Sequence, residues 1–194
     1  MPDDARARGW GRLETRGLGF AFAGVLVLFV AAVLISYSTL SGRVAGGGGS
    51  LAAPLGDPHT PLFLAILLRN SAVALGLFAG VLTAGVGSLI GIALVGFLVG
   101  ASTAAAATEV GLAAALSSVV GYAVIEIPAL LLAATAGVLP GASVLFPSRR
   151  MGDLRPLARY LARLPNALLI LAIALALIAV GAGVETFIIT ARRF

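Results

Sequence analysis

Long apolar stretches, separated by short polar breaks, dominate the pattern of this chain. They cover residues 18–40, 62–101, 110–138 and 166–190. A helix needs about 20 apolar residues to cross a bilayer. The stretch 62–101 is about twice that length, so it predicts two helices, 62–83 and 86–102, with a tight turn near Gly85 and Gly87. The pattern therefore predicts an all-α, polytopic transmembrane bundle of about five spanning helices.

The segments between these stretches have the composition of breaks and surface structure. Residues 41–61 contain a run of glycines and several prolines, which is typical of a flexible loop, and residues 102–109 form a polar break. Pro128 lies inside the helix 110–138 and predicts a kink, while Pro140 and the glycine after it predict where that helix ends.

Residues 154–164 have a different pattern, in which arginines alternate with leucines and one tyrosine at helical spacing. This predicts a short amphipathic cytoplasmic helix that lies on the membrane surface. A plain solvated loop is the alternative interpretation.

The basic residues, which are all arginine, predict the orientation of the bundle. They concentrate in the tail 1–17 and in the loop 139–165, and a five-helix bundle places both on the same side. Positive charge favours the cytoplasmic side, so we expect both segments there and the loop 41–61 outside. A four-helix bundle would place the arginine-rich loop outside and is rejected. Arg192 and Arg193 are a minor exception to the rule.

The domain organisation follows from these spans. We expect a cytoplasmic N-terminal tail, 1–17, followed by one transmembrane domain, 18–194, in a multi-pass protein of the cell membrane. The first apolar stretch is longer than the apolar region of about 7–15 residues in a signal peptide, which favours a retained helix over a cleaved one.

Composition excludes several classes of function. The chain has no cysteine and a single histidine, His59, which excludes disulfides, thiolate metal sites and multi-histidine sites. We expect no enzyme, no cofactor and no metal. The sequence pI is about 11, but no basic stripe carries interleaved aromatic residues, so we expect no nucleic-acid partner. The expected partners are the lipid bilayer and other membrane or envelope proteins, and a homo-oligomer is left open.

Three charged residues lie inside the apolar stretches, at Arg69, Glu126 and Glu185. A charge at bilayer depth costs at least about 2.5–3.5 kcal/mol, so it usually faces a partner or water. From the helical rise, Arg69 and Glu185 lie roughly 10 and 8 Å from the outer ends of their helices, and Glu126 roughly 22 Å. Arg69 and Glu185 are therefore the expected ion pair, and Glu126 the expected lone carboxylate.

These residues, with Asn70, form the predicted buried polar network. Further side chains within hydrogen-bonding reach are Ser71, Ser117, Ser118, Tyr122 and Thr186. The network has two interpretations. One is structural, as a set of interhelical contacts, and the other is a site that responds to a proton or a substrate through Glu126.

Glycines four residues apart are a second recurring feature, because small residues at that spacing let helices approach closely in lipid. They predict packing within the bundle or, as an alternative, a dimer face. The pairs are Gly76 and Gly80, Gly87 and Gly91, and Gly96 and Gly100.

Three segments together resemble the stage II sporulation protein M family of prokaryotic membrane proteins. Residues 66–100 carry a polar pair and a glycine-phenylalanine-x-x-glycine close, residues 124–137 carry a glutamate-x-proline-alanine motif, and residues 177–190 carry a glutamate before an aromatic residue. The matching positions are Arg69, Asn70, Gly96, Phe97, Gly100, Glu126, Pro128, Ala129, Glu185 and Phe187.

The chain departs from the family pattern at two places. Val95 stands where relatives often have asparagine, and Tyr122-Ala123 where they often have histidine-glycine. These losses argue against a family-wide proton chemistry beside Glu126.

The resemblance implies a membrane protein that, in spore-forming organisms, anchors and recruits peptidoglycan-degrading enzymes during engulfment. The first functional hypothesis is therefore a non-enzymatic membrane scaffold or recruiter of partner proteins. The alternative is a transporter, or a transporter subunit, for a small or lipid-like solute that uses the buried Glu126. A hydrolase is least favoured, because the sequence offers no nucleophile–base pair or metal constellation.

Overall fold

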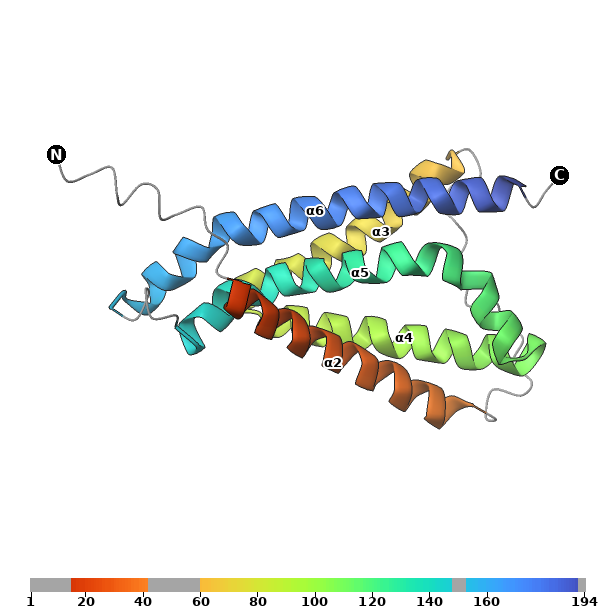
Figure 1. Cartoon of the computed structure of the whole chain (residues 1–194), viewed down its shortest axis with the longest axis horizontal. Helices are drawn as coiled ribbons and strands as arrows, with labels where there is room; N and C mark the ends of the chain where they lie inside the picture. Colours follow the sequence, from red (N-terminus) through yellow and green to blue (C-terminus); the bar gives the residue numbers. More distant parts are fainter. Residues whose placement is uncertain (1–14, 42–59, 148–152, 192–194) are drawn as a thin grey trace.

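A computed structural model describes residues 15–41, 60–147 and 153–191, and all regular structure in these ranges is helical. Figure 1 shows the arrangement of the elements. They are α2 (Thr15–Leu40), α3 (Leu62–Phe78), the 3-10 helix η1 (Ala79–Thr83), α4 (Val86–Val110), α5 (Leu112–Leu145) and α6 (Pro156–Ala191).

Five candidate membrane spans lie in these helices, which confirms the predicted all-α, multi-span fold class. Their bounds are Gly17–Leu40, Leu62–Thr83, Val86–Val110, Ala123–Leu145 and Pro156–Ala191. Successive spans run in opposite directions (Figure 1). The beginnings of α2 and α6 lie at one end of the bundle together with η1, and the ends of α2, α4 and α6 lie at the other.

Helix α5 is the centre of the bundle and contacts α2, α3, α4, α6 and η1. Its second half is rich in alanine, and Ala129, Ala133, Ala134 and Ala136 have no exposed surface. Small side chains let neighbouring backbones approach from several sides. Among the described residues, α2 packs on α4 and α5 without reaching α3 or α6.

The turn between η1 and α4 lies where the sequence predicts it. Ala84 and Gly85 both have a left-handed backbone, with φ of 53° and 97°, and such a backbone is easily adopted by glycine. The amide of Gly87 donates to the Thr83 hydroxyl at 2.8 Å. The Ser88 hydroxyl donates to the carbonyl of Leu77 at 2.7 Å, which ties the start of α4 to the end of α3.

This turn packs tightly on α5 through glycines. A methyl group on Gly80 or Gly137 would overlap the Ser88 hydroxyl, and one on Gly141 would overlap the carbonyl of Ala84. The methyl group on Gly137 would also lie 2.7 Å from the carbonyl oxygen of Leu77. Gly137 and Gly141 are also four residues apart, although they are not among the pairs predicted from the sequence.

The predicted packing glycines divide into two groups. Gly96 and Gly100 bring α4 against α2, and a methyl group on Gly96 would lie 2.7 Å from the carbonyl oxygen of Phe29. Gly80, Gly87 and Gly91 also lie at close contacts around the turn. Gly76 takes no part in this packing within the bundle, because nothing lies within 4 Å of a methyl group placed there. That position faces outward from α3.

Two predicted helix ends differ from the structure. The third span continues beyond residue 102 to Val110, because the polar break contains four alanines, which favour a helix, and its threonines bond to their own helix. Thr103 donates to the carbonyl of Val99 at 2.8 Å, and Thr108 to that of Ala104 at 2.9 Å.

Pro140 does not end α5, which runs on to Leu145. Proline removes one backbone donor from a helix interior, but the residues around it, from Leu139 to Gly141, are buried in the bundle. We infer that packing keeps this segment helical.

The predicted amphipathic helix is not a separate element. Residues 156–164 form the first turns of α6, which continues through Pro165 into the last span. The 36 residues of α6 extend about 54 Å, whereas the hydrocarbon core of a bilayer is about 30 Å thick. Part of α6 therefore extends beyond the core.

We expect Gly137→Ala to destabilise the bundle by about 1–3 kcal/mol, the usual cost of overpacking a tight interior. The added methyl group would displace Ser88 or the end of α3. The matched control is Gly76→Ala, which adds the same atom in open space. Thermal unfolding of the detergent-solubilised protein measures both. If the two variants are equally stable, the close approach of the turn to α5 does not limit the stability of the bundle.

Candidate polar site between α3, α5 and α6

Three polar residues inside the spans, Asn70, Glu126 and Glu185, come together where α3, α5 and α6 meet. The side-chain amide of Asn70 on α3 donates a hydrogen bond of 2.7 Å to Oε1 of Glu126 on α5. The two residues are 56 positions apart in the chain, and both are half-buried. The bond therefore links two helices that are distant in sequence.

Glu185 on α6 completes the cluster. Its carboxyl group lies close to the Glu126 carboxyl group, and Glu185 is also half-buried. Arg69 is exposed and acts on Glu185 by electrostatic attraction. We call Arg69, Asn70, Glu126 and Glu185 the polar cluster.

The expected ion pair of Arg69 with Glu185 stays a prediction, and the position of Glu126 differs from the expected one. The sequence predicts that Glu126 lies alone and deep, whereas the structure places its carboxyl group near that of Glu185. In Figure 1, the first turns of α5 lie at an angle to the rest of the helix. Counting residues along α5 therefore overestimates the distance of Glu126 from the end of the bundle.

Gly181 makes room for Glu126 between α5 and α6. A methyl group on Gly181 would lie 3.0 Å from Cγ of Glu126 and 3.6 Å from its Oε1. Gly181 and the next residue, Ala182, are both buried. The sequence analysis did not include Gly181, although it lies one turn before Glu185 on α6, where a small residue faces the same neighbours.

The other polar side chains considered from sequence do not extend the cluster. The hydroxyl of Thr186 donates to the carbonyl of Ala182 in its own helix, and that of Ser117 donates to Ala114. Ser71 is half-buried beside Asn70. The side chains of Ser118 and Tyr122 lie outside the described residues.

Pro128 lies two residues after Glu126 inside α5. Because proline has no N–H, the carbonyl of Val124 loses its usual helical donor. The predicted kink at Pro128 stays a prediction.

The chemistry of the polar cluster is limited to hydrogen bonding and proton sharing. A carboxylate group has only acceptor atoms, so a hydrogen bond between two carboxyl groups requires a proton on one of them. The described residues include no group of three or more potential metal ligands among His, Cys, Asp and Glu. The cluster therefore has the composition of a contact between helices or of a proton-carrying site.

Comparison with known families identifies the chain. The family model described as Stage II sporulation protein M matches residues 18–189. The chain belongs to this family. The match extends over nearly the whole of the five candidate spans. Comparison with curated proteins and with solved structures gives no match.

The three segments that resemble the family contribute residues to the polar cluster. The polar pair of the first segment, the glutamate of the second and the glutamate of the third are the members of the polar cluster. The glycine-phenylalanine-x-x-glycine motif at the end of the first segment lies elsewhere, at the contact of α4 with α2. Polar residues from three segments that are far apart in the chain thus meet at one place.

We expect Gly181→Ala to disturb the polar cluster and Gly183→Ala to leave it intact. The first substitution places a methyl group 3.0 Å from Cγ of Glu126, whereas nothing lies within 4 Å of a methyl group on Gly183. The expected loss is about 1–3 kcal/mol of stability for Gly181→Ala alone. Thermal unfolding in detergent measures this loss. If Asn70→Ala costs as much stability in the Gly181→Ala variant as it does in the wild type, Gly181 and Asn70 do not act through a shared contact.

Proposed function

We propose that this family member is a non-enzymatic membrane scaffold that recruits partner proteins, with the polar cluster as the contact that fixes three of its helices. The observation that carries the proposal is that the members of the polar cluster interact with one another across three helices. Asn70 donates to Glu126, the carboxyl groups of Glu126 and Glu185 lie close together, and the positive charge of Arg69 attracts Glu185.

Energetics support a structural role for the polar cluster. Hydrogen bonds between helices in a membrane contribute about 0.6–2 kcal/mol each, and a lone polar group in hydrocarbon is costly. A cluster that joins α3, α5 and α6 therefore stabilises one arrangement of the bundle. A recruiter needs such a fixed surface, and the family resemblance implies recruitment of peptidoglycan-degrading enzymes.

A transporter, or a transporter subunit, for a small or lipid-like solute is the second candidate. The observation that favours it is the proximity of two carboxyl groups inside candidate membrane spans. Ionisable groups in that position are typical of proton relays. In this alternative, Glu126 would bind or release a proton as the solute passes.

The substitution Glu126→Gln distinguishes the two candidates. A glutamine oxygen still accepts the hydrogen bond from Asn70, so a scaffold should stay folded and co-purify with the same partner proteins from native membranes in gentle detergent. The control is Glu109→Gln, which changes an exposed glutamate near the end of α4.

A flux measurement tests the transporter candidate directly. In reconstituted vesicles with an imposed pH gradient, a scaffold should leave proton leakage at the level of protein-free vesicles. Leakage or solute uptake that the wild type supports, and that Glu126→Gln abolishes while Glu109→Gln does not, would overturn the scaffold proposal and favour transport.

We further propose that the N-terminus and the loop before α6 lie in the cytoplasm of a multi-pass protein in the cell membrane. The beginnings of α2 and α6 lie at the same end of the bundle (Figure 1). The arginines of the sequence concentrate before these two helices, as they do on the cytoplasmic side of membrane proteins.

Cysteine labelling tests this orientation, because the chain has no cysteine of its own. In intact cells, a membrane-impermeant maleimide should label Ser50→Cys, whereas Ala5→Cys and Ser148→Cys should react only after permeabilisation. The reverse pattern would show that the bundle is inserted the other way round.

A further inference from the structure

Glu126 of α5 and Glu185 of α6 approach each other across the contact between their helices. A methyl group on Gly181 would lie 3.0 Å from Cγ of Glu126, so Glu126 packs directly on that turn of α6. Glu185 follows one turn later, on the same face, and helical side chains lean toward the N-terminus of their helix. The helix geometry thus brings its carboxyl group toward Glu126, in agreement with the electrostatic interaction between the two groups.

The charges of the polar cluster balance when it holds one proton. The groups that act on the two carboxyl groups are Arg69 and Asn70, both on α3. The charged residues of α2 and α4, Arg16 and Glu109, lie near the ends of their helices, and the arginines of α6 lie in its first turns. Two carboxylates and one guanidinium leave one negative charge uncompensated. Such a charge inside a membrane span is costly, and one proton removes it.

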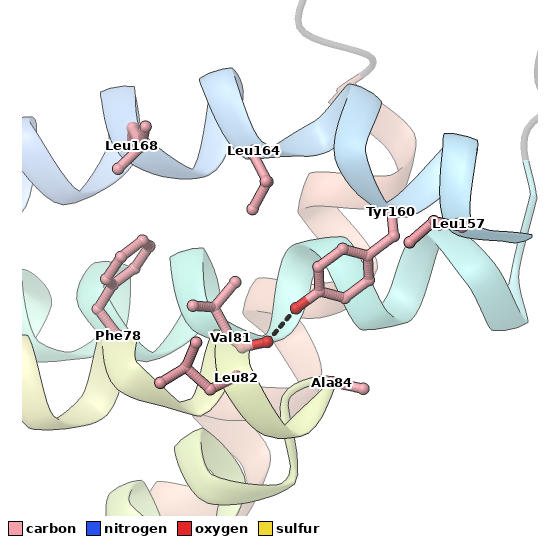
Figure 2. Close-up of a pocket in the computed structure, with 8 residues that line it drawn as sticks. All are labelled: Phe78, Val81, Leu82, Ala84, Leu157, Tyr160, Leu164 and Leu168. Atoms are coloured by element: carbon pink, nitrogen blue, oxygen red, sulfur yellow. Dashed lines mark hydrogen bonds between the residues drawn. The ribbon is translucent and has the colours of Figure 1, made fainter.

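The beginning of α6 is fixed independently of the polar cluster. Figure 2 shows Tyr160 of α6 against η1, with its hydroxyl donating a hydrogen bond to the carbonyl of Val81. The Ser143 hydroxyl of α5 also donates to the carbonyl of Arg159 at 3.3 Å. Glu185 lies 25 residues after Tyr160, which is about 38 Å along a helix. The polar cluster therefore holds the second half of α6, and the bond of Tyr160 holds the first.

We propose that Glu126 and Glu185 share one proton, and that the loss of this proton in alkaline solution loosens the second half of α6 from α5. Two ionised carboxyl groups at close range in surroundings of low polarity repel each other. The folded protein then binds one proton that the unfolded chain releases, so its stability falls as the pH rises. The proposal concerns the polar cluster alone and does not depend on whether the chain recruits partner proteins.

The neighbouring groups assign the proton to Glu126. The amide of Asn70 donates to Oε1 of Glu126 at 2.7 Å. A protonated carboxyl group accepts through one oxygen and donates through the other, so Oε2 of Glu126 carries the proton and donates it in a hydrogen bond to Glu185. Glu185 stays ionised, and the positive charge of Arg69 balances it.

Infrared spectroscopy of the full chain, in a detergent without carbonyl groups, detects the shared proton. The carbonyl band of a protonated carboxyl group is separate from the carboxylate bands and shifts in D₂O. Ordinary carboxyl groups are ionised at neutral pH, so we expect this band from the pair, and its loss in alkaline solution. Glu126→Gln and Glu185→Gln should both lack the band, because Arg69 balances the one remaining carboxylate. The control Glu109→Gln, at an exposed position, should keep it.

The charge balance is tested by Arg69→Gln. Without the guanidinium, a neutral cluster requires a proton on each carboxyl group, so the band should grow about twofold. An unchanged band would overturn the charge balance on which the proposal rests. The proposal is also overturned if the wild type shows no such band at neutral pH, or if Glu126→Gln retains it.

Thermal unfolding over the same pH range tests the loosening of α6. The wild type should unfold at a lower temperature in alkaline than in neutral solution. Glu126→Gln should lack this drop, because its amide donates a hydrogen bond without losing a proton. Glu185→Gln replaces it if Glu126→Gln does not fold.

The matched control is Tyr160→Phe, which removes a hydrogen bond from the beginning of α6. It should lower the unfolding temperature at every pH and retain the alkaline drop, which excludes ionisation of Tyr160 as the cause. A drop in Glu126→Gln as large as in the wild type, or its loss in Tyr160→Phe, would overturn the loosening. Neither method measures recruitment, so these results are separate from the test of the scaffold.

Discussion

The close approach of other backbones to α5 is the constraint on which the rest of the bundle depends. Alanines and glycines occupy the second half of this helix, and Gly137 and Gly141 lie directly against the turn between η1 and α4. In lipid, helices gain little from the hydrophobic effect and associate through close packing and polar contacts. Because α5 touches every other described element, any larger side chain on this surface would separate several helices at once.

The polar cluster depends on the same helix from its other half. Where α5 leaves the tight packing, Glu126 is directed toward α3 and α6, and Gly181 provides the space that its side chain needs. The hydrogen bond from Asn70 then fixes α3. Packing through small residues and bonding through polar residues thus act at different places along α5, and together they determine how α3 and α6 lie against it.

The sequence predicts the spans well because each depends on a local quantity, the length of an apolar stretch. It predicts which residues belong to the polar cluster for a similar reason, since a charge inside such a stretch is conspicuous. The sequence does not predict which residues of the cluster pair with one another. Glu126 lies beside Glu185 because the first turns of α5 are inclined (Figure 1), and no residue count along a straight helix contains that angle. The continuity of α6 through Pro165 likewise depends on the whole fold, because proline alone favours a break.

Residues of the family motifs lie at contacts between helices. Short motifs at residues 69–70, 126 and 185 would have no common purpose in an extended chain, but in the bundle their side chains meet. The glycines that end the first motif serve a different contact, that of α4 with α2. The motifs thus lie at contacts between helices: their polar residues join α3, α5 and α6, and the glycines of the first join α4 to α2.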